Sequence, residues 1–423
     1  MLYVYKSMQG KILNEKGTAV RRSHLLFILV TGMLAGLFIS RAVLSACEIA
    51  FVVVSLFHRD IKKQVRVFFS TPLLWSMSLL FFIPLLSGWW SADRERWLYI
   101  IQVKLPLLFL PLGFAGPFRF SKKQWEWLGW IFTGIIFLAS VWTMIRYIPD
   151  RIRIDESYLK AKAILTPLEN DHVRFSWLVS AAVLLSGWMG YTTGREKRWL
   201  RTVLWLTAAW LMVFLHIMAA RTGLFSLYIM FLLTTGWLIT RKGNWRYALL
   251  LPVVLILLPV TAYHTFPSFQ NRVRFIQYDL GYFREAHYLQ GATDALRVIS
   301  IKAGWELMRQ EPLTGTGFGD IASESVKWYD RHYPGMAASD KIIPGSQWVL
   351  YGAGSGIGGL LVFIFCMLVP FFTASRNRLL WWSLNATLAL SLLFDIGLEV
   401  QFGVFIHAFM VLWWWKWMNK ENK

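Results

Sequence analysis

Residues 293–319 read TDALRVISIKAGWELMRQEPLTGTGFG. They lie inside the longest polar interval of the chain, from about Thr265 to Pro344, in a sequence otherwise made of apolar runs. A simple turn does not need that length, and loops this long are usually functional. The interval therefore predicts a large loop, residues 265–345, that carries a site and returns the chain to the next apolar run.

The apolar runs around this loop set the class of the protein. The chain has 423 residues, of which 56% are hydrophobic and 16% charged, whereas soluble domains carry about 25% charged residues. Long uninterrupted runs favour helices, because only closed hydrogen-bonding patterns satisfy the backbone in lipid. Spans of a β-barrel would alternate instead. We expect an all-α polytopic membrane protein, with residues 1–423 forming one membrane domain.

A membrane-spanning helix needs about 20 apolar residues, and on that criterion we predict about twelve spans. Their approximate ranges are 24–40, 42–57, 71–89, 99–117, 126–145, 175–192, 199–219, 223–240, 247–264, 346–372, 379–397 and 399–416.

The charges predict how these spans are oriented. Lys and Arg gather in the short loops on one side, whereas the two long loops, 146–174 and 265–345, carry nearly balanced charge. The positive-inside rule then places both termini in the cytoplasm and both long loops outside, in the periplasm if the membrane is a bacterial inner membrane. A net charge of +20 raises the question of nucleic-acid binding, but the placement of the charges argues against it.

We assign structural and no functional roles to the terminal tryptophans and to the two cysteines. Trp413, Trp414 and Trp415 end the last predicted span, and we interpret them as part of an interfacial aromatic belt. The two cysteines, Cys47 and Cys366, lie in separate apolar runs and predict no disulfide framework. The chain has none of the His/Cys spacings of metal sites, so no metal and no cofactor are expected.

Arg221 is the first candidate site residue. It stands in Ala219-Ala220-Arg221-Thr222-Gly223, a tight turn between two apolar runs, with no acid nearby in the sequence. An arginine at membrane depth costs about 2.5–3.5 kcal/mol on insertion scales, unless it reaches water along its own stem. An anion contact and a snorkelling boundary arginine are both open; any acidic partner must come from elsewhere.

Arg297 lies on a predicted helix that begins near Thr293 or Asp294, either of which can cap it. Leu296, Ile299, Ala303 and Leu307 share one face of this helix, so it should lie against an apolar surface. Glu311-Pro312 should end it. Arg297 either contributes to an anion site or pairs on the surface with Asp294 three residues earlier.

Two further stretches carry candidates. The run Gly315-Thr316-Gly317-Phe318-Gly319 lacks the Lys-Ser/Thr of a nucleotide loop; its amides either approach an anion or form a plain turn. His172 and Arg174 stand where the sixth span begins, and a histidine there has a pKa suited to acting as a base. An interfacial polar pair is the simpler alternative.

The last candidate residues are two acids. Asp395 and Glu399 lie at the turn between the last two predicted spans, and Glu399 is placed to pair with Arg221 or Arg297. Such a pair would hold an arginine in position.

Taken in order, these motifs resemble the O-antigen ligase and O-antigen polymerase superfamily of bacterial inner-membrane proteins. The resemblance rests on the number of spans, the large loop before the tenth, and Arg-Thr-Gly at Arg221. It also rests on Arg297 followed by Trp305, Pro312-Leu313 and the glycine run, and on Leu-Glu-x-Gln-x-Gly at Leu398–Gly403. Lys104-Leu105-Pro106-Leu107 and Asp171-His172 are weaker echoes.

The resemblance implies transfer of a glycan from an undecaprenyl diphosphate carrier, at the periplasmic face, to lipid A–core or to another lipid-linked glycan. It implies that Arg221 and Arg297 hold the diphosphate, since guanidiniums bind phosphate bidentately. His172 would assist catalysis, and Arg174, Trp305, Gly315, Gly317, Gln347 and Glu399 would line the substrate site.

One position departs from the family. Family ligases usually carry Pro-His-Asn after the large loop, whereas this chain reads Pro344-Gly345-Ser346-Gln347. His172 is a possible substitute for the missing histidine. The alternatives are a transporter or flippase for lipid-linked sugars, which should show inverted repeats and charges at the midplane, and a non-catalytic member of a polysaccharide assembly complex.

Overall fold

The computed structural model describes residues 2–160, 162–168, 171–240, 245–284 and 294–418. Within these ranges the chain is helical and has no strand. Twelve helices coincide with the twelve predicted apolar runs. They are α1 Leu2–Ile39, α2 Arg41–Leu56, α4 Pro72–Ser87, α5 Arg94–Phe114, α6 Lys122–Tyr147, α8 His172–Thr192, α9 Arg198–Met218, α10 Arg221–Ile239, α11 Trp245–Thr265, α15 Gln347–Phe372, α16 Arg378–Ser391 and α17 Gln401–Met418.

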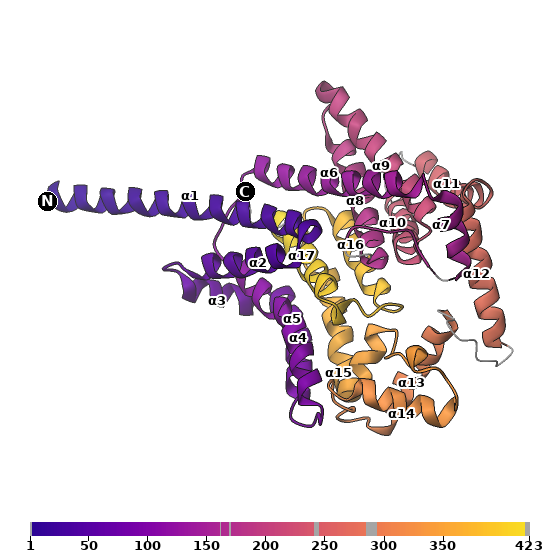
Figure 1. The fold of residues 1–423 in the computed structure, drawn as a ribbon. Coiled ribbons are helices and arrows are strands. Elements are labelled where there is room, and N and C mark those ends of the chain that lie inside the picture. Colours follow the sequence, from indigo (N-terminus) through magenta and orange to yellow (C-terminus); the bar gives the residue numbers. More distant parts are fainter. Residues whose placement is uncertain (1, 161, 169–170, 241–244, 285–293, 419–423) are drawn as a thin grey trace.

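Shorter helices fill the connections between them (Figure 1). They are α3 Ile61–Ser70, α7 Arg151–Ser157, α12 Pro267–Arg284, α13 Asp294–Gln310, α14 Ile321–His332, and the 3-10 turns η1 Tyr158–Lys160, η2 Arg195–Lys197, η3 Ala338–Asp340 and η4 Gly397–Glu399. Four of these, α12, α13, α14 and η3, belong to the interval 265–345.

Fewer than twelve of the described helices meet a strict criterion for crossing a membrane. By length and composition, seven helices of the described part are able to cross a membrane, or nine if two sharply bent pairs each count as one span. One bent pair is α2 with α3, at 110°, and the other joins Pro252–Thr265 to Pro267–Gly281 at 99°. The helix α4 is apolar but shorter than the usual span. The sequence correctly located the helices, but apolar content alone overstated how many meet a strict span criterion.

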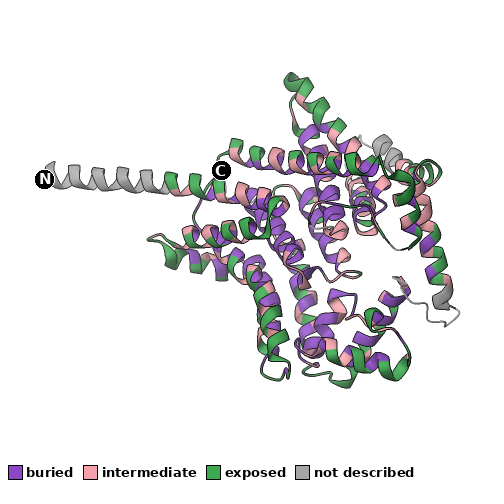
Figure 2. Cartoon of the chain, in the orientation of Figure 1, coloured by how far each residue is buried: buried purple, intermediate pink, exposed green. Residues whose placement is uncertain are grey.

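The helix α17 forms the centre of the bundle. Nearly every residue of Gln401–Met418 is buried, and buried residues also dominate α8 (Figure 2). The prediction for Trp413, Trp414 and Trp415 was therefore wrong: they are at most 6% exposed and pack inside the protein. Trp413 stacks on Trp417 at 6.1 Å and meets Phe132 edge-on at 5.7 Å. A sequence cannot distinguish such a cluster from an aromatic belt, because both are runs of Trp at a helix end.

The large loop folds into a lobe with a small core of its own. Ala295, Leu296, Ile299 and Ala303 of α13 pack with Trp328 and its neighbours on α14. The predicted apolar face of the Arg297 helix is thus confirmed, and Leu307 is buried as well. The helix ends at Gln310, directly before Glu311-Pro312, as expected. The lobe lies beside α15 (Figure 1).

Candidate functional site

The turn between α9 and α10 places Arg221. α9 ends at Met218 and α10 begins at Arg221, with Ala219 in the left-handed region (φ 48°). Gly223 allows α10 to approach α8, since a β-carbon there would lie 2.6 Å from Ser176. Ser180 completes the contact by donating to the Gly223 carbonyl at 2.7 Å. The Arg-Thr-Gly motif is therefore a close helix–helix contact that puts Arg221 at the same end as the start of α8.

Both long loops are fastened to this turn. From loop 146–174, Tyr158 donates to the Met218 carbonyl at 2.8 Å. From the large loop, Ser268 donates to the Ile217 carbonyl at 2.6 Å. The loops also bond to each other, through Asn271 and the carbonyl of Asp155 at 2.8 Å. The two predicted outer loops thus form one structure around Arg221.

Arg221 forms an ion pair with Asp294, the first residue of α13. The acid predicted to come from elsewhere in the chain is therefore Asp294, which was expected to serve as a cap or as a surface partner of Arg297. Asp294 is itself placed by Asp279 of α12, which accepts its backbone N–H at 2.7 Å. The Arg221 side chain is 37% exposed, so its guanidinium keeps an open side.

Arg297 lies within electrostatic range of Arg221. Burial lowers the pKa of Arg297 from its usual value, while the Asp395 carboxylate opposes this and Arg174 adds to it. The structure thus brings together the two arginines that the sequence analysis paired, although 76 positions (221 to 297) separate them in the chain. Like charges held this close need compensation, which the aspartates supply.

Arg174 and Asp395 connect this cluster to α8 and to the last loop. Arg174 forms ion pairs with Asp171 at 3.4 Å and with Asp395 at 3.0 Å. Burial raises the pKa of Asp395, and the neighbouring Arg174 counteracts the rise. His172 begins α8, two residues before Arg174, and is half-buried.

Arg272 is a fourth arginine here, and the sequence analysis did not identify it. It lies on α12 within electrostatic range of Arg221, with its guanidinium over the ring of Tyr158 at 4.8 Å. It donates to the Lys162 carbonyl at 2.9 Å. Its spacing on α12 carried no motif, so only the packing of the loops reveals it.

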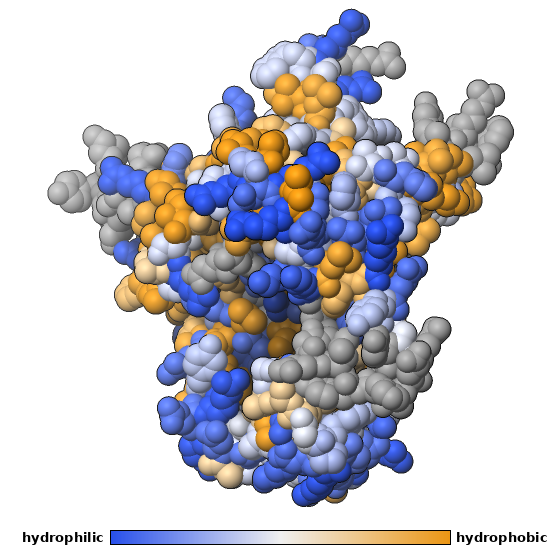
Figure 3. Space-filling view, turned by 45° about the vertical axis from the view of Figure 1, so that its right-hand side comes forward, coloured by the Kyte–Doolittle hydropathy of each residue, from blue (hydrophilic) through white to orange (hydrophobic). Residues whose placement is uncertain are grey.

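We call Arg174, Arg221, Arg272 and Arg297, with Asp279, Asp294 and Asp395, the arginine site. Among the described residues, the buried Nε atoms of Arg174 and Arg272 have no hydrogen-bond acceptor. Buried donors are rarely left unsatisfied, which sets these two nitrogens apart from most buried donors. The surface is hollowed just above the α13–α14 lobe, and both hydrophilic and hydrophobic residues reach into the hollow (Figure 3).

Two predicted substrate contacts instead bind within the protein, around η4. Glu399 pairs with Lys104 of α5 at 2.6 Å rather than with Arg221 or Arg297. Gln347 is fully buried and donates to the same Glu399 oxygen at 2.7 Å, while accepting from the Leu398 amide at 2.9 Å. Both side chains are thus occupied within the protein, and the acid of this turn that faces the arginines is Asp395.

The glycine run is a packing joint. Gly315 and Gly317 have positive φ angles of 64° and 87°, and the Thr316 and Gly317 amides donate to carbonyls of Ala353 and Gly354 in α15. The amides of Phe318 and Gly319 donate to Ser87 and Ser91 at the end of α4. The Gly315 amide donates to the Glu311 carbonyl at 2.9 Å, so the amides of both Gly315 and Gly317 are used within the protein in this structure.

Trp305 occupies a different position from the other candidates. It lies on α13 and is 49% exposed, so its ring faces outward, away from the apolar side of the helix. Its place in the substrate site stays a prediction.

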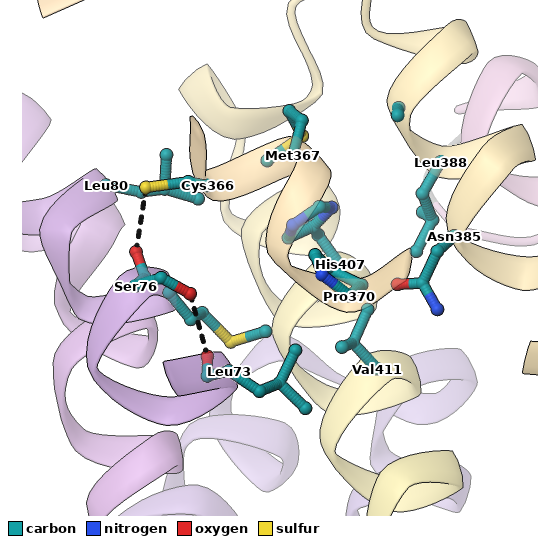
Figure 4. Close-up of a pocket in the computed structure, with 12 residues that line it drawn as sticks. Leu73, Ser76, Leu80, Cys366, Met367, Pro370, Asn385, Leu388, His407 and Val411 are labelled. Carbon is teal, nitrogen blue, oxygen red and sulfur yellow. Dashed lines mark hydrogen bonds between the residues drawn. The ribbon is translucent and has the colours of Figure 1, made fainter. Parts of the chain in front are cut away.

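A small enclosed cavity lies elsewhere, between α4, α15, α16 and α17 (Figure 4). It measures about 20 Å³ and is lined by Ser76, Cys366, Asn385 and His407 among apolar residues. That is room for about one water molecule, and it shares no residue with the arginine site. No group of three or more His, Cys, Asp or Glu side chains is placed to hold a metal in the part of the chain that the structure describes.

Comparison with known proteins supports the resemblance. Residues 206–364 match the family model described as O-antigen ligase. The matched segment contains Arg221, Arg272 and Arg297, while Arg174, Asp395 and the Lys104–Glu399 pair lie outside it. No protein of curated function matches the chain. Residues 206–364, just over a third of the chain, are therefore similar to the O-antigen ligase family.

Proposed function

We propose that this protein transfers a glycan from an undecaprenyl diphosphate carrier to an acceptor hydroxyl at the periplasmic face of a bacterial inner membrane. The acceptor is either lipid A–core or a second lipid-linked glycan. The observation that carries the proposal is the convergence of Arg221 and Arg297, from α10 and α13, within a site that also holds Arg174 and Arg272.

The negative charge that develops on the leaving group in this reaction suits a site with several arginines. The acceptor oxygen forms a bond to the anomeric carbon, and the bond from that carbon to the diphosphate oxygen breaks. The electron pair leaves with the lipid diphosphate, so negative charge develops there, and fixed guanidiniums stabilise it as it grows. Arginine contacts to a leaving phosphate contribute roughly 10³–10⁵ in rate in other phosphate-transferring enzymes.

The ion pairs with aspartates leave N–H donors of the arginines available to a diphosphate. A guanidinium has five N–H donors, and a single carboxylate engages at most a bidentate pair of them. Asp294 therefore holds one side of Arg221 and leaves donors on the other, consistent with the 37% exposure of that side chain. In the proposal Asp294 and Asp395 orient the arginines, and the diphosphate binds the open sides.

The acceptor must also lose a proton. Gly345 offers no base, and we assign this role to His172, at the start of α8 near the Arg174–Asp395 pair. The proton then leaves the acceptor hydroxyl for an imidazole nitrogen as the glycosidic bond forms.

Two measurements test the proposal. Purified full-length protein is titrated with undecaprenyl diphosphate, and with undecaprenyl monophosphate for comparison, by native mass spectrometry. Arg221→Lys and Arg297→Lys should weaken diphosphate binding by about tenfold or more, because a point charge lacks the bidentate fork. Arg309→Lys is the matched control: Arg309 lies on the same helix as Arg297 but is 67% exposed beside Glu306.

The second measurement is the length of lipid-linked polysaccharide on gels after deletion of the gene and complementation with each variant. Loss of long chains with the two site variants, and recovery with Arg309→Lys, is expected. Unchanged chains after deletion would overturn the proposal. Tight diphosphate binding together with failure of the lipid-linked repeat to reach the outer leaflet would favour the transporter class instead.

A further inference from the structure

The helix α3 turns sharply away from α2, at 110°. One side of α3 is fixed to the bundle by Gln64, which donates to the Leu112 carbonyl of α5 at 2.6 Å. Nε2 of His58 lies 2.5 Å from the amide oxygen of Gln64. Phe68, one turn later on the same side, is 6% exposed. The orientation of α3 is therefore set by buried polar contacts.

A second side of α3 exposes apolar residues. Ile61, Val65 and Phe69 follow each other at intervals of four and are 37%, 41% and 68% exposed, and Phe57 before the helix is 78% exposed. Residues at this spacing lie on one face of a helix. The stripe thus remains partly open in the described part of the chain, most of all at Phe57 and Phe69.

A third side carries positive charge. Lys62, Lys63 and Arg66 are all exposed, and Asp60 is the one acidic residue in the sequence from 57 to 70. On a helical projection the cations adjoin the exposed stripe and point away from Gln64. The helix thus presents a buried side, an exposed apolar side and a cationic side in order around its axis.

Two environments fit this arrangement badly. Inside the hydrocarbon three adjacent cations would be desolvated without partners, and in bulk water four large apolar side chains would stay exposed. At the boundary between headgroups and acyl chains both sides are satisfied, which is where amphipathic helices with a basic face lie. We propose that α3 is an interfacial helix that binds anionic phospholipid headgroups.

The occupant follows from the charge. Three exposed cations within five residues favour a phosphodiester-bearing anionic lipid over a zwitterionic one, by roughly fivefold in affinity per cation near the surface. In Figure 1, α3 lies toward the end of the molecule that carries the N-terminus, away from α12. In the orientation expected from the charges this is the cytoplasmic leaflet, so the surface is separate from the arginine site.

Lipid selectivity tests the proposal. Full-length protein is reconstituted into phosphatidylcholine vesicles, and the protein-bound fraction of spin-labelled phosphatidylglycerol is compared with that of spin-labelled phosphatidylcholine. Lys62→Gln/Lys63→Gln/Arg66→Gln should remove most of the preference for phosphatidylglycerol. The matched control, Arg119→Gln/Lys122→Gln/Lys123→Gln, removes three exposed cations before and at the start of α6. An equal loss in both triples would overturn a site at α3.

Depth measurements keep the proposal testable if the triple variant folds poorly. Spin labels are placed on Phe69→Cys and, separately, on Lys63→Cys, with the labelled parent protein as a blank. The label at 69 should be accessible to oxygen and protected from a water-soluble relaxant, and the label at 63 should show the reverse. Water access at both positions would overturn the proposal, and so would lipid access at both, which would make α2 and α3 one broken span.

Discussion

Gly345 lies directly against the side chain of Arg297. A β-carbon at position 345 would be 2.7 Å from Cγ of Arg297 and 3.1 Å from Oγ of Ser300, and the Gly345 amide already donates to that oxygen at 2.9 Å. Where the resemblance to O-antigen ligases led us to expect a histidine, this chain uses the space for the stem of Arg297. The two residues therefore form one unit.

The first prediction follows from this contact. Gly345→Ala and Gly345→His should each lower glycan transfer by roughly a hundredfold, the cost of a 1 Å misplacement at a reacting centre, because Arg297 must move. Thermal unfolding in detergent should change little, since the clash falls on a flexible side chain. Gly358→Ala on α15 is the control, because no atom lies within 4 Å of its new β-carbon. A gain of transfer with Gly345→His would contradict the shared-space argument.

The second prediction concerns Arg272. Arg272→Gln removes the contact with the Tyr158 ring and the charged donor to the Lys162 carbonyl. Unfolding should become easier by about 1–3 kcal/mol, the usual cost of losing a buried charged hydrogen bond, and diphosphate binding should weaken as the positive field at Arg221 falls. Arg274→Gln, two residues along the same helix and exposed, should alter neither quantity. Identical behaviour of the two variants would remove Arg272 from the site.

The third prediction concerns the buried Lys104–Glu399 pair, to which we assign a structural role and no catalytic one. Lys104→Met leaves Glu399 buried and uncompensated, which should cost about 3–5 kcal/mol of stability. Lys104 is fully buried, and the pair spans α5 and η4, so the loop carrying Asp395 should loosen as well. Equilibrium unfolding in mixed micelles measures the loss.

An exposed pair provides the comparison. Lys327→Met breaks a contact with Glu324 of similar length, 2.7 Å, but with the lysine 59% exposed, and it should change stability by about 0–1 kcal/mol. Equal effects for the two substitutions would mean that burial does not determine the strength of the Lys104 pair.

The fourth prediction treats the glycine run as a joint. Gly317→Ala places a β-carbon 2.4 Å from Oγ of Ser91 at a φ of 87°, so both strain and a clash oppose it. Gly335→Ala has a similar φ of 91° but open space around it, and should show only the strain of about 1–2 kcal/mol. Gly317→Ala should therefore unfold at a clearly lower temperature, while the folded fraction binds undecaprenyl diphosphate normally. Selective loss of diphosphate affinity would restore an anion-binding role to this run.

Local patterns predicted much of the architecture. Apolar runs of span length located twelve helices, and within the predicted loop 265–345 the described chain forms the shorter helices α12, α13 and α14. The periodicity of Leu296, Ile299, Ala303 and Leu307 predicted the buried face of α13, because a helix buries residues at intervals of three and four whatever it packs against. Arg221 was recognised because an arginine between two apolar runs is costly and needs a reason.

Such local patterns did not predict which charged residues pair with each other. Asp294 was considered as a helix cap or as a surface partner of Arg297, but it pairs with Arg221. Glu399 pairs with Lys104, 295 positions earlier in the chain. Arg272 carried no local signal and joins the site only because the two long loops pack together. Ion pairs between distant segments depend on which helix ends lie next to each other in the folded protein. No short stretch of a single sequence carries that information.

What the sequence determined by itself, then, is the membrane class and the helices, because these depend on hydropathy and period along one segment; it also singled out Arg221 and Arg297 as candidates. The tertiary structure decided which acid faces which arginine, that Gln347 and the glycine run hold the protein together, and that the terminal tryptophans face inward. Those outcomes depend on desolvation and close packing between segments that lie far apart in the chain.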